Sequence, residues 1–403
     1  MFRLALRNVF RHRLRTALTL AAIVSGVVGL ILSGGFIEDS LDQLREATIH
    51  SQVGHLQIYK AGYYAQGSQT PYRYMIDKPQ QLADLAHSMP RVQEVMARLN
   101  FTGMLDNGRT AIPILGTGLE PEAEARLGSS VRIIEGRQLS DKDAYGILLG
   151  EGVASATKLK PGDRVTLLVT AAEGALNNLD FEVVGVFRSF SRDHDARAVR
   201  IPLRAAQELL DVRAANAIVV LLDDTAATNE IAARLKQKLD GDAYEVMTWD
   251  ELADFYDKTA ALYRREFGVL QFIVLIAVLL SVVNSVNMSI FERTGEFGTL
   301  MALGNKGKTV FQLILTENLI LGLIGSVGGA LFGMLLAWGI SSVGIPMPPP
   351  PNSNSGYTAL IRVVPSVVAS ALLVGFLATI VASLLPARRA ARLRVVEALR
   401  QNQ

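Results

Sequence analysis

The sequence contains no cysteine, and only 19% of its 403 residues are charged. The absence of cysteine excludes disulfide bonds, thiolate metal sites and lipid attachment through sulfur, so the chain is not itself a lipoprotein. The formal net charge of +2 says little about function until the charges are placed along the chain. Half of the residues are hydrophobic, which favours a membrane protein that also carries a folded soluble part.

A helix needs about 20 apolar residues to cross a bilayer, and several uncharged runs reach that length. The first run could also be a signal peptide, but its long apolar core and the weak cleavage site after Gly34 favour a retained helix. The third run is expected to begin near Thr309, so that Glu317 lies within it. The predicted spans are residues 17–36, 267–291, 309–342 and 363–387.

Basic side chains flank these spans unevenly, and cytoplasmic loops carry the excess of lysine and arginine. Arginines cluster in residues 1–16 and 388–403, and the loop 292–308 is also basic, whereas the loop 343–362 holds only Arg362. Both termini and the middle loop are therefore predicted to be cytoplasmic. Residues 37–266 then lie outside, which in a bacterium with two membranes places them in the periplasm and the spans in the inner membrane.

The first 16 residues alternate apolar side chains with arginines at helical spacing. This pattern is typical of an amphipathic helix lying on an anionic leaflet. It is also consistent with a mere topology signal, and both interpretations stay open.

The outer block of residues 37–266 is long enough to bury a core of its own. Its ends continue the spans as stalk helices. Between them, we expect an α+β domain with an inserted subdomain over about residues 116–190. The predicted fold is thus an α-helical membrane protein with four transmembrane helices and a large α+β extracytoplasmic domain between the first and second. The clearest predicted strands are residues 55–59, 111–115, 146–149, 164–169, 181–187 and 217–222.

Motifs for chemistry are weak. The segment Ala302–Thr309 differs from a phosphate-binding loop at its first position, which requires glycine, and no strand is expected before it. The histidines at 50, 55 and 194 lack the spacing of a metal site. The sequence therefore predicts no catalytic residue, no metal and no cofactor bound by this chain, and we expect it not to be an enzyme.

Small and polar residues within the spans have two interpretations each. Gly325, Gly329 and Gly333 recur every four residues, which favours close helix packing, either within one subunit or between two. Asn284 and Asn287 could hydrogen-bond across helices. Glu317 is costly in a membrane and is a functional candidate, although it could also reach interfacial water or Lys308.

The chain resembles the permease family that includes FtsX, the macrolide-exporter permease MacB and the lipoprotein-releasing permeases LolC and LolE. The resemblance rests on the basic opening MFRLALRNVFRHRLRTALT, on ERTGEFGTLMALG, on TENLILGLIGSVGGALFG and on the closing PARRAARLRVVEALR. It covers the whole chain in order. Phe297, Met301 and Val395 or Val396 depart from the family's usual Ile, Arg and Pro, which affects the details of an ATPase contact.

The resemblance implies a dimer, with a second copy or a paralogue, bound to two separate ATPase subunits that carry the ATP and magnesium. The segment 292–304 would be the coupling helix, and its apolar face would fit a groove of the ATPase. The residues assigned to this contact are Glu292, Arg293, Gly295, Glu296, Phe297, Gly298, Leu300, Met301, Ala302, Leu303 and Gly304. Pro386, Arg388 and Arg389 belong to the tail motif.

Within the family, the segments GHLQIYKAGY, IPLRAAQELLDV and MTWDELADFY are similar to those of lipoprotein-releasing permeases. The resemblance therefore implies a permease that couples ATP hydrolysis to periplasmic movement (mechanotransmission) and releases lipoproteins, with a periplasmic carrier or adaptor as a further partner. Two alternatives stay open. One is an exporter or mechanotransmission permease for another periplasmic substrate, and the other is a complex that signals or activates a cell-wall hydrolase. Membrane lipids are expected partners, and nucleic acid is not.

Overall fold

The computed structural model describes residues 5, 7, 8, 11, 13–67, 71–127, 131–349 and 356–392. Half of the predicted N-terminal helix (residues 1–16) and the tail beyond residue 392 lie outside this range. The chain divides into two compact units. One is helical, formed by Met1–Asp42, Thr259–Met347 and Thr358–Gln403, and the other is an α/β unit formed by Gln43–Lys258 with Pro348–Tyr357.

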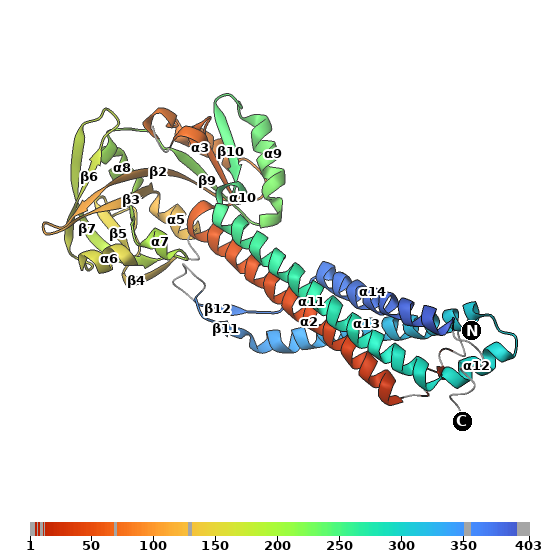
Figure 1. Cartoon of the computed structure of the whole chain (residues 1–403). Coiled ribbons are helices and arrows are strands. Elements are labelled where there is room, and N and C mark those ends of the chain that lie inside the picture. The colour runs from red at the N-terminus through yellow and green to blue at the C-terminus, as the bar shows by residue number, and fades with distance from the viewer. Residues whose placement is uncertain are drawn as a thin grey trace. The chain divides into compact units, whose positions relative to one another are not determined.

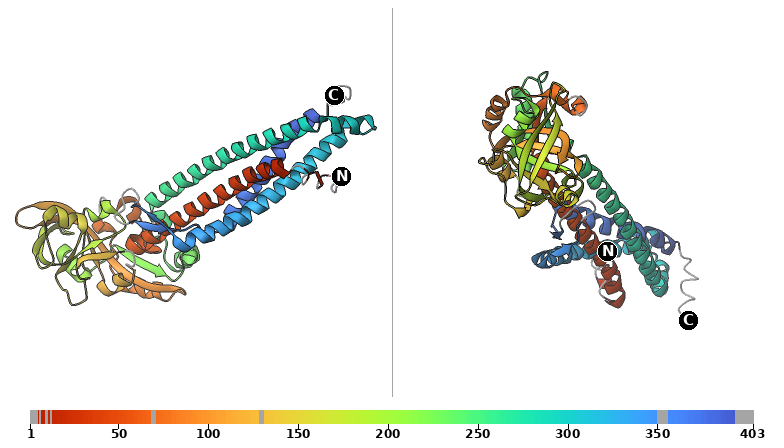
Figure 2. Two further views of the ribbon diagram at one scale, coloured as in Figure 1. Left: turned by 90° about the horizontal axis from the view of Figure 1, so that it is seen from below. Right: turned by 90° about the vertical axis from the view of Figure 1, so that its left-hand side faces the viewer.

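The described residues include four helices that are long and apolar enough to cross a membrane, which confirms the predicted spans as helices. Figures 1 and 2 show their ribbons running along one another. They are α2 (Arg13–Thr48), α11 (Asp254–Glu292), α13 (Gly307–Val343) and α14 (Pro365–Ala390), and the short α12 (Thr294–Ala302) joins α11 to α13. Between α13 and α14, β11 (Ile345–Met347) pairs with β12 (Tyr357–Ala359).

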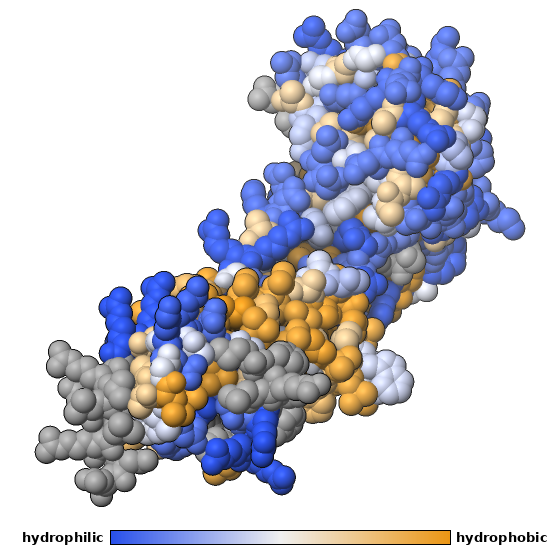
Figure 3. Space-filling view, turned by 90° about the vertical axis from the view of Figure 1, so that its right-hand side faces the viewer, coloured by the Kyte–Doolittle hydropathy of each residue, from blue (hydrophilic) through white to orange (hydrophobic). Residues whose placement is uncertain are grey.

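The helices of this unit bury one common apolar core and leave their other faces apolar as well. The core includes Ile23 of α2, Val282 of α11, Ile314 of α13 and Ala378 of α14. Such all-round apolarity is expected of helices in lipid, where the hydrocarbon surrounds the bundle. Figure 3 shows apolar side chains gathered over the helices, while the surface of the α/β unit is largely hydrophilic.

The α/β unit is built on one mixed ten-stranded sheet with the order β10-β1-β9-β2-β3-β8-β5-β7-β4, and β6 pairs with β2 and β7. Two of its pairs, β3 with β8 and β5 with β7, are parallel, and the remaining pairs are antiparallel. This confirms the predicted α+β class. The strands are β1 (Leu56–Lys60), β2 (Val92–Asp106), β3 (Ala111–Leu119), β4 (Arg132–Gly136), β5 (Gly146–Gly150), β6 (Arg164–Thr170), β7 (Leu176–Arg188), β8 (Ala198–Pro202), β9 (Ala217–Leu222) and β10 (Tyr244–Thr248).

Short helices cover this sheet and bury two main apolar clusters. One cluster lies around β1, β9, α4 and α9, and the other around β3, β5, β6, β7 and α8. The second cluster also contains Leu99 and Leu209, so it draws on more of the chain than the predicted insertion at 116–190. The helices are α3 (Tyr63–Gln66), α4 (Pro79–His87), α5 (Pro121–Leu127), α6 (Glu151–Thr157), α7 (Arg192–Asp195), α8 (Leu203–Leu210), α9 (Thr228–Lys238) and α10 (Trp249–Leu252).

Short segments of chain connect the long helices α2 and α11 to strands of the sheet. After α2, the chain forms a π-helical turn at Ile49–Val53, and Gly54 then adopts a φ of +67°, a left-handed conformation that favours glycine. Strand β1 begins two residues later at Leu56. On the return, Thr248 and Glu251 form a capping box at the start of α10, one residue before α11.

Candidate coupling site

The helix α12 lies in the turn between α11 and α13, within the segment predicted to couple to a partner. Arg293 separates it from α11, because its φ of −105° and ψ of 14° interrupt the helix. At the other end, Gly304 has a φ of +91°, and its backbone N–H donates to the carbonyl of Met301. This left-handed glycine ends the helix, as is common at helix C-termini.

The side chains of α12 divide into a buried and an exposed set. Phe297 is only 1% exposed and packs into the core of the helical unit, against which Leu300 and Met301 also lie. Leu303, just after the helix, is 77% exposed. The apolar face predicted to fit a partner is therefore largely used inside this chain. The exposed side chains left for a partner at this segment are Glu292, Glu296, Thr299, Ala302 and Leu303.

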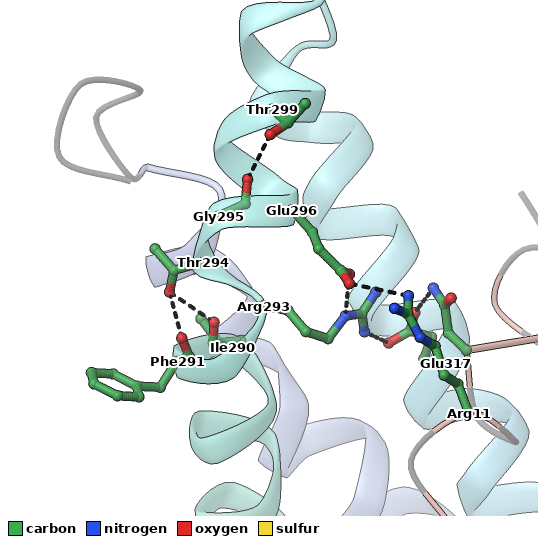
Figure 4. A network of polar contacts seen from close by, with 10 residues as sticks. Arg11, Ile290, Phe291, Arg293, Thr294, Gly295, Glu296, Thr299 and Glu317 are labelled. Atoms are coloured by element: carbon green, nitrogen blue, oxygen red, sulfur yellow. Dashed lines mark hydrogen bonds and ion pairs between the residues drawn. The ribbon is translucent and has the colours of Figure 1, made fainter. Parts of the chain in front are cut away.

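Arg293 connects α12 to the body of the helical unit, and its side chain is buried. Its Nη1 donates to Oε2 of Glu317 in α13 at 2.8 Å, and its Nε donates to Oε2 of Glu296 at 3.1 Å. The guanidinium also stacks over the ring of Phe297, 5.0 Å from its centroid. Figure 4 shows the arginine between the two carboxylates. A guanidinium has several fixed donors, so one arginine can hold two acidic side chains at once.

Glu317 is 8% exposed and lies two to three turns inside α13. Besides Arg293, it accepts a hydrogen bond from Nδ2 of Asn8 at 2.7 Å, so each carboxylate oxygen has a partner. The partners of Glu317 are thus protein groups of the same chain, and the structure does not pair it with Lys308. A buried carboxylate needs such a partner, because an unpaired charge in this environment is costly.

Two residues of the N-terminal segment reach the same carboxylates as Arg293. Asn8 binds Glu317, and Nη1 of Arg11 lies 3.2 Å from Oε1 of Glu296. Ala5, one turn earlier, is fully buried in the core of the helical unit. These contacts place the described part of the segment against the protein's own helices.

A small cavity of about 40 Å³ lies beside Glu317 and is lined mainly by polar side chains. Its volume is enough for an ordered water, which needs polar partners such as these. The lining side chains include Thr16 and Thr19 of α2, Ser285 and Ser289 of α11, and Asn318 of α13. Polar side chains therefore line this part of the bundle's interior, next to apolar side chains of the core such as Ile314.

The glycines of α13 lie against α2 of the same chain. A Cβ atom at Gly325 would meet Ile23, one at Gly329 would meet Val24 and Val27, and one at Gly333 would meet Ile31. Of the two interpretations, packing within one subunit accounts for this spacing. By contrast, Asn284 and Asn287 are exposed on α11.

The remaining residues singled out in the sequence are spread over the chain. Pro386 is buried within α14, and Arg388 and Arg389 are exposed near its end. The rings of His50 and His55 pack edge to face at 5.8 Å, whereas His194 lies in α7 beside Asp195. Among the residues that the structure describes, no three His, Asp or Glu side chains gather as metal ligands.

A second polar cluster, at the other end of the helical unit, was missed by sequence reasoning. Asp39 is buried in α2 and accepts the backbone N–H of Leu360 at 2.8 Å. The Nη1 atom of Arg362 lies 2.5 Å from Oδ2 of Asp42, one turn further along α2. In the sequence, this cluster could have been predicted from Asp39 and Asp42, three residues apart after the first span, together with Arg362, the single basic residue of the loop 343–362.

Together, four apolar helices, a large α/β insertion after the first and a short helix after the second define a polytopic membrane protein with an extracytoplasmic domain. Residues 16–238 match the family model of the MacB-like periplasmic core domain, and residues 268–395 match that of the FtsX-like permease C-terminal domain. The chain belongs to the FtsX/MacB/LolC family of ABC transporter permeases.

Similarity to individual relatives is low but extends along the chain. An uncharacterised ABC transporter permease of Bacillus subtilis, YvrN, is 24% identical over 99% of this chain and 98% of its own. The lipoprotein-releasing system transmembrane protein LolC of Neisseria meningitidis is 22% identical over 81% of this chain and 78% of its own. The macrolide export ATP-binding/permease protein MacB of a Shewanella strain is 23% identical over 98% of this chain, which spans 60% of that protein.

Proposed function

We propose that this chain is the permease subunit of an ABC transporter whose ATP is hydrolysed by a separate subunit, and that α12 is the contact between them. The observation that carries the proposal is the exposed set of side chains at the end of α12, with Leu303 as its apolar centre. The larger apolar side chains of the segment, Phe297, Leu300 and Met301, pack in or against the chain's own core. An exposed leucine held beside the left-handed Gly304 could insert into an apolar groove of a partner.

The proposed arrangement is a dimer of this chain, or of this chain and a paralogue, in a bacterial inner membrane, with two ATPase subunits on the cytoplasmic side and the α/β unit in the periplasm. The chain itself would bind no cofactor, since ATP and magnesium would bind to the ATPase. Ala302 and Gly304 belong to the end of α12 and its cap, which is the wrong context for a phosphate-binding loop.

The proposed cargo is a lipoprotein that is released from the inner membrane to a periplasmic carrier, driven by movement of the α/β unit. The support is the similarity to LolC along most of the chain and the lipoprotein-type segments named above. The second candidate is export of another periplasmic substrate, which the MacB-like core domain favours. Mass spectrometry of proteins and lipids that purify with the chain in mild detergent separates them. A bound carrier and lipoproteins support release, and an adaptor with an outer-membrane duct supports export.

The test of the coupling contact is Leu303→Asp. Burying a charge in an apolar contact costs several kcal/mol of binding free energy. Because about 1.4 kcal/mol corresponds to a tenfold change, the affinity for the ATPase should fall by orders of magnitude. The exposed Leu303 contributes little to the chain's own core, so the variant should fold and insert normally. Affinity pull-down of the ATPase and the ATP turnover of the purified complex measure the effect.

The matched controls are Lys306→Ala, an exposed position in the turn beyond α12, and Phe297→Asp, which disrupts the chain's own core instead. Lys306→Ala should keep the partner, and Phe297→Asp should reduce folding. If Leu303→Asp retains the ATPase and its turnover at the level of the unmodified chain, α12 is not the coupling contact. The chain purified without the ATPase should not hydrolyse ATP.

A further inference from the structure

The contacts of Glu317 link three separate segments at one buried point. Through Arg293 it holds the start of α12, and through Asn8 it holds the segment before α2, while its own backbone belongs to α13. Apolar packing of Phe297 and Ala5 in the core that α13 shares also links these segments to α13, but apolar contacts have no fixed direction, whereas the polar contacts of Glu317 do. α12 reaches α13 through the residues Leu303 to Lys306, all of which are exposed.

That connecting turn changes helix between Asn305 and Lys306. Gly304 adopts a left-handed conformation there, and the backbone N–H of Asn305 donates back to Leu300 of α12 at 3.1 Å. The carbonyl of Lys306 instead accepts the backbone N–H of Thr309 in α13 at 2.8 Å. In contrast, the Arg293–Glu317 pair is buried at both ends, with side chains 6% and 10% exposed. A buried ion pair keeps its geometry, because separating the charges leaves each one without water or partner.

The charges at this point are balanced between the segments. Arg293 and Arg11 supply the positive charges, and Glu296 and Glu317 the negative ones. Asn8 adds a neutral donor on the oxygen of Glu317 that Arg293 does not use. Among the described residues, removing the charge of Glu317 therefore leaves Arg293 with the half-exposed Glu296, which α12 itself carries, as its one acidic partner.

We propose that Glu317 is a positioning residue that binds the start of α12 and the N-terminal segment to α13, so that these segments move as one body when α12 is displaced. A load on α12 then reaches α13 directly, and not through the glycine turn. The N-terminal segment is part of this body and is not only a lipid-bound helix. The role in transmission rests on the proposed function of α12, whereas the rigid joint itself does not.

The test uses the cysteine-free chain in lipid nanodiscs, with spin labels on cysteines at Thr299 in α12 and Gln312 in α13, both exposed. Pulsed electron–electron double resonance should give one narrow distribution of label-to-label distances when Glu317 is unchanged. Glu317→Gln keeps the shape of the side chain and removes its charge, and it should lose the narrow peak. The matched control is Glu266→Gln, which removes the same charge from an exposed position of α11 and should leave the peak intact.

A second variant tests the N-terminal arm and does not break the ion pair. Asn8→Leu should leave the Thr299–Gln312 distribution narrow and broaden that between labels at Arg7 and Gln312. If the Thr299–Gln312 distances stay narrowly distributed in Glu317→Gln, Glu317 does not fix α12 to α13. If the Arg7–Gln312 distances stay narrowly distributed in Asn8→Leu, the N-terminal segment is not held to α13 through Asn8. If Glu317→Gln does not fold, Asn8→Leu still tests the attachment of the N-terminal segment. Arg293→Lys, which keeps the positive charge but loses the paired donors of the guanidinium, then tests the attachment of α12.

The outcomes also separate this proposal from the coupling contact. Leu303→Asp should lose the ATPase and keep the narrow Thr299–Gln312 distribution. Glu317→Gln should keep the ATPase bound and lose the stimulation of its turnover by the permease. Full stimulation in Glu317→Gln with the ATPase bound would show that the joint does not transmit the load, even where α12 is the contact.

Discussion

Gly329 of α13 lies directly against the backbone of Val24 in α2. A Cβ atom placed on Gly329 would come within 3.1 Å of Cα of Val24 and 2.9 Å of Cβ of Val27. Because one of these neighbours is backbone, the helices must separate to accept any larger side chain. The close approach of α2 and α13 therefore depends on this glycine.

We expect Gly329→Leu to destabilise the helical unit by about 1–3 kcal/mol, the usual cost of overpacking, and to lower the midpoint of thermal unfolding in detergent. Gly328→Leu is the matched control, since a Cβ at Gly328 meets no atom within 4 Å. Equal midpoints for the two variants would contradict the packing described here.

A buried charge cluster holds α5 onto the sheet of the α/β unit. Arg98 of β2 donates to both oxygens of Glu124, at 3.0 and 2.6 Å, and Nη1 of Arg200 in β8 lies 3.6 Å from the same carboxylate. All three side chains are buried. Arg200 also donates to the carbonyl oxygen of Ser51 at 3.1 Å, at the end of the entering helix.

Glu124→Ala leaves two guanidiniums buried without their carboxylate, and we expect a loss of about 3–5 kcal/mol. Glu122→Ala, at an exposed position of the same helix, should change stability by about 0.5 kcal/mol or less. With Trp338→Phe as background, Trp249 is the sole tryptophan of the full chain, and its fluorescence in a urea titration reports on this unit. Similar urea midpoints for the two variants would show that the cluster is not a main support of the fold.

His55 is expected to make the α/β unit sensitive to acid. Its Nδ1 accepts the backbone N–H of Leu222 at 3.1 Å, so the neutral ring carries its proton on Nε2, 3.0 Å from Oγ1 of Thr225. Burial, followed by the charge of His50, lowers the pKa of His55 from 6.5 to about 4. The unfolded chain therefore takes up the proton first, and stability is complete above about pH 6.5 and declines towards about pH 4.

Between about pH 6.5 and pH 4, the free energy of unfolding should fall by up to about 3 kcal/mol, since each unit of pKa shift corresponds to about 1.4 kcal/mol. Hydrogen exchange of peptides that cover β9, in the full chain, should show reduced protection at about pH 5 relative to about pH 7 after correction for intrinsic rates. His55→Asn keeps an acceptor for Leu222 and should remove most of the dependence, whereas the exposed His87→Asn should not. If protection depends on pH in the same way in His55→Asn, the dependence comes from another titratable group.

The orientation of the chain can be tested with single cysteines, because the natural sequence has none. A cysteine at Asp242, exposed in the α/β unit, should react with a membrane-impermeant maleimide in cells whose outer membrane has been permeabilised. One at Asn305, in the turn after α12, should react only after the inner membrane is opened. Labelling of Asn305 under the first condition would reverse the predicted topology.

The sequence predicted the helices of the membrane unit and the apolar strands of the α/β unit well, because both have a clear periodicity. Strands such as β5 and β9 are buried along their whole length and read as continuous apolar runs. Strand β2 was missed, since Glu94, Arg98 and Asn100 interrupt its pattern. Their partners lie far along the chain: Arg98 binds Glu124, and the backbone N–H of Asn100 donates to Asn216.

The candidate site shows the same limit. Periodicity placed Phe297, Leu300 and Met301 on one apolar face of α12, but could not tell whether that face meets a partner or the chain's own core. The structure buries Phe297 in that core. The alternatives for Glu317 could not be separated either, because Asn8 lies 309 positions away in the sequence.

The attachment of α2 and α11 to neighbouring strands would restrict any motion that these helices transmit in the proposed function. β1 follows α2 directly, β10 precedes α11 through α10, and the two strands pair from Leu56 with Thr248 to Lys60 with Tyr244. If one helix slid like a piston past the other, this register would have to slip, and a slip by one residue turns every side chain of the strand to the opposite face. Buried Leu56 and Ile58 oppose such a slip. Tilting or twisting of the two helices leaves the register intact and would instead be passed on as a change in the twist of the sheet.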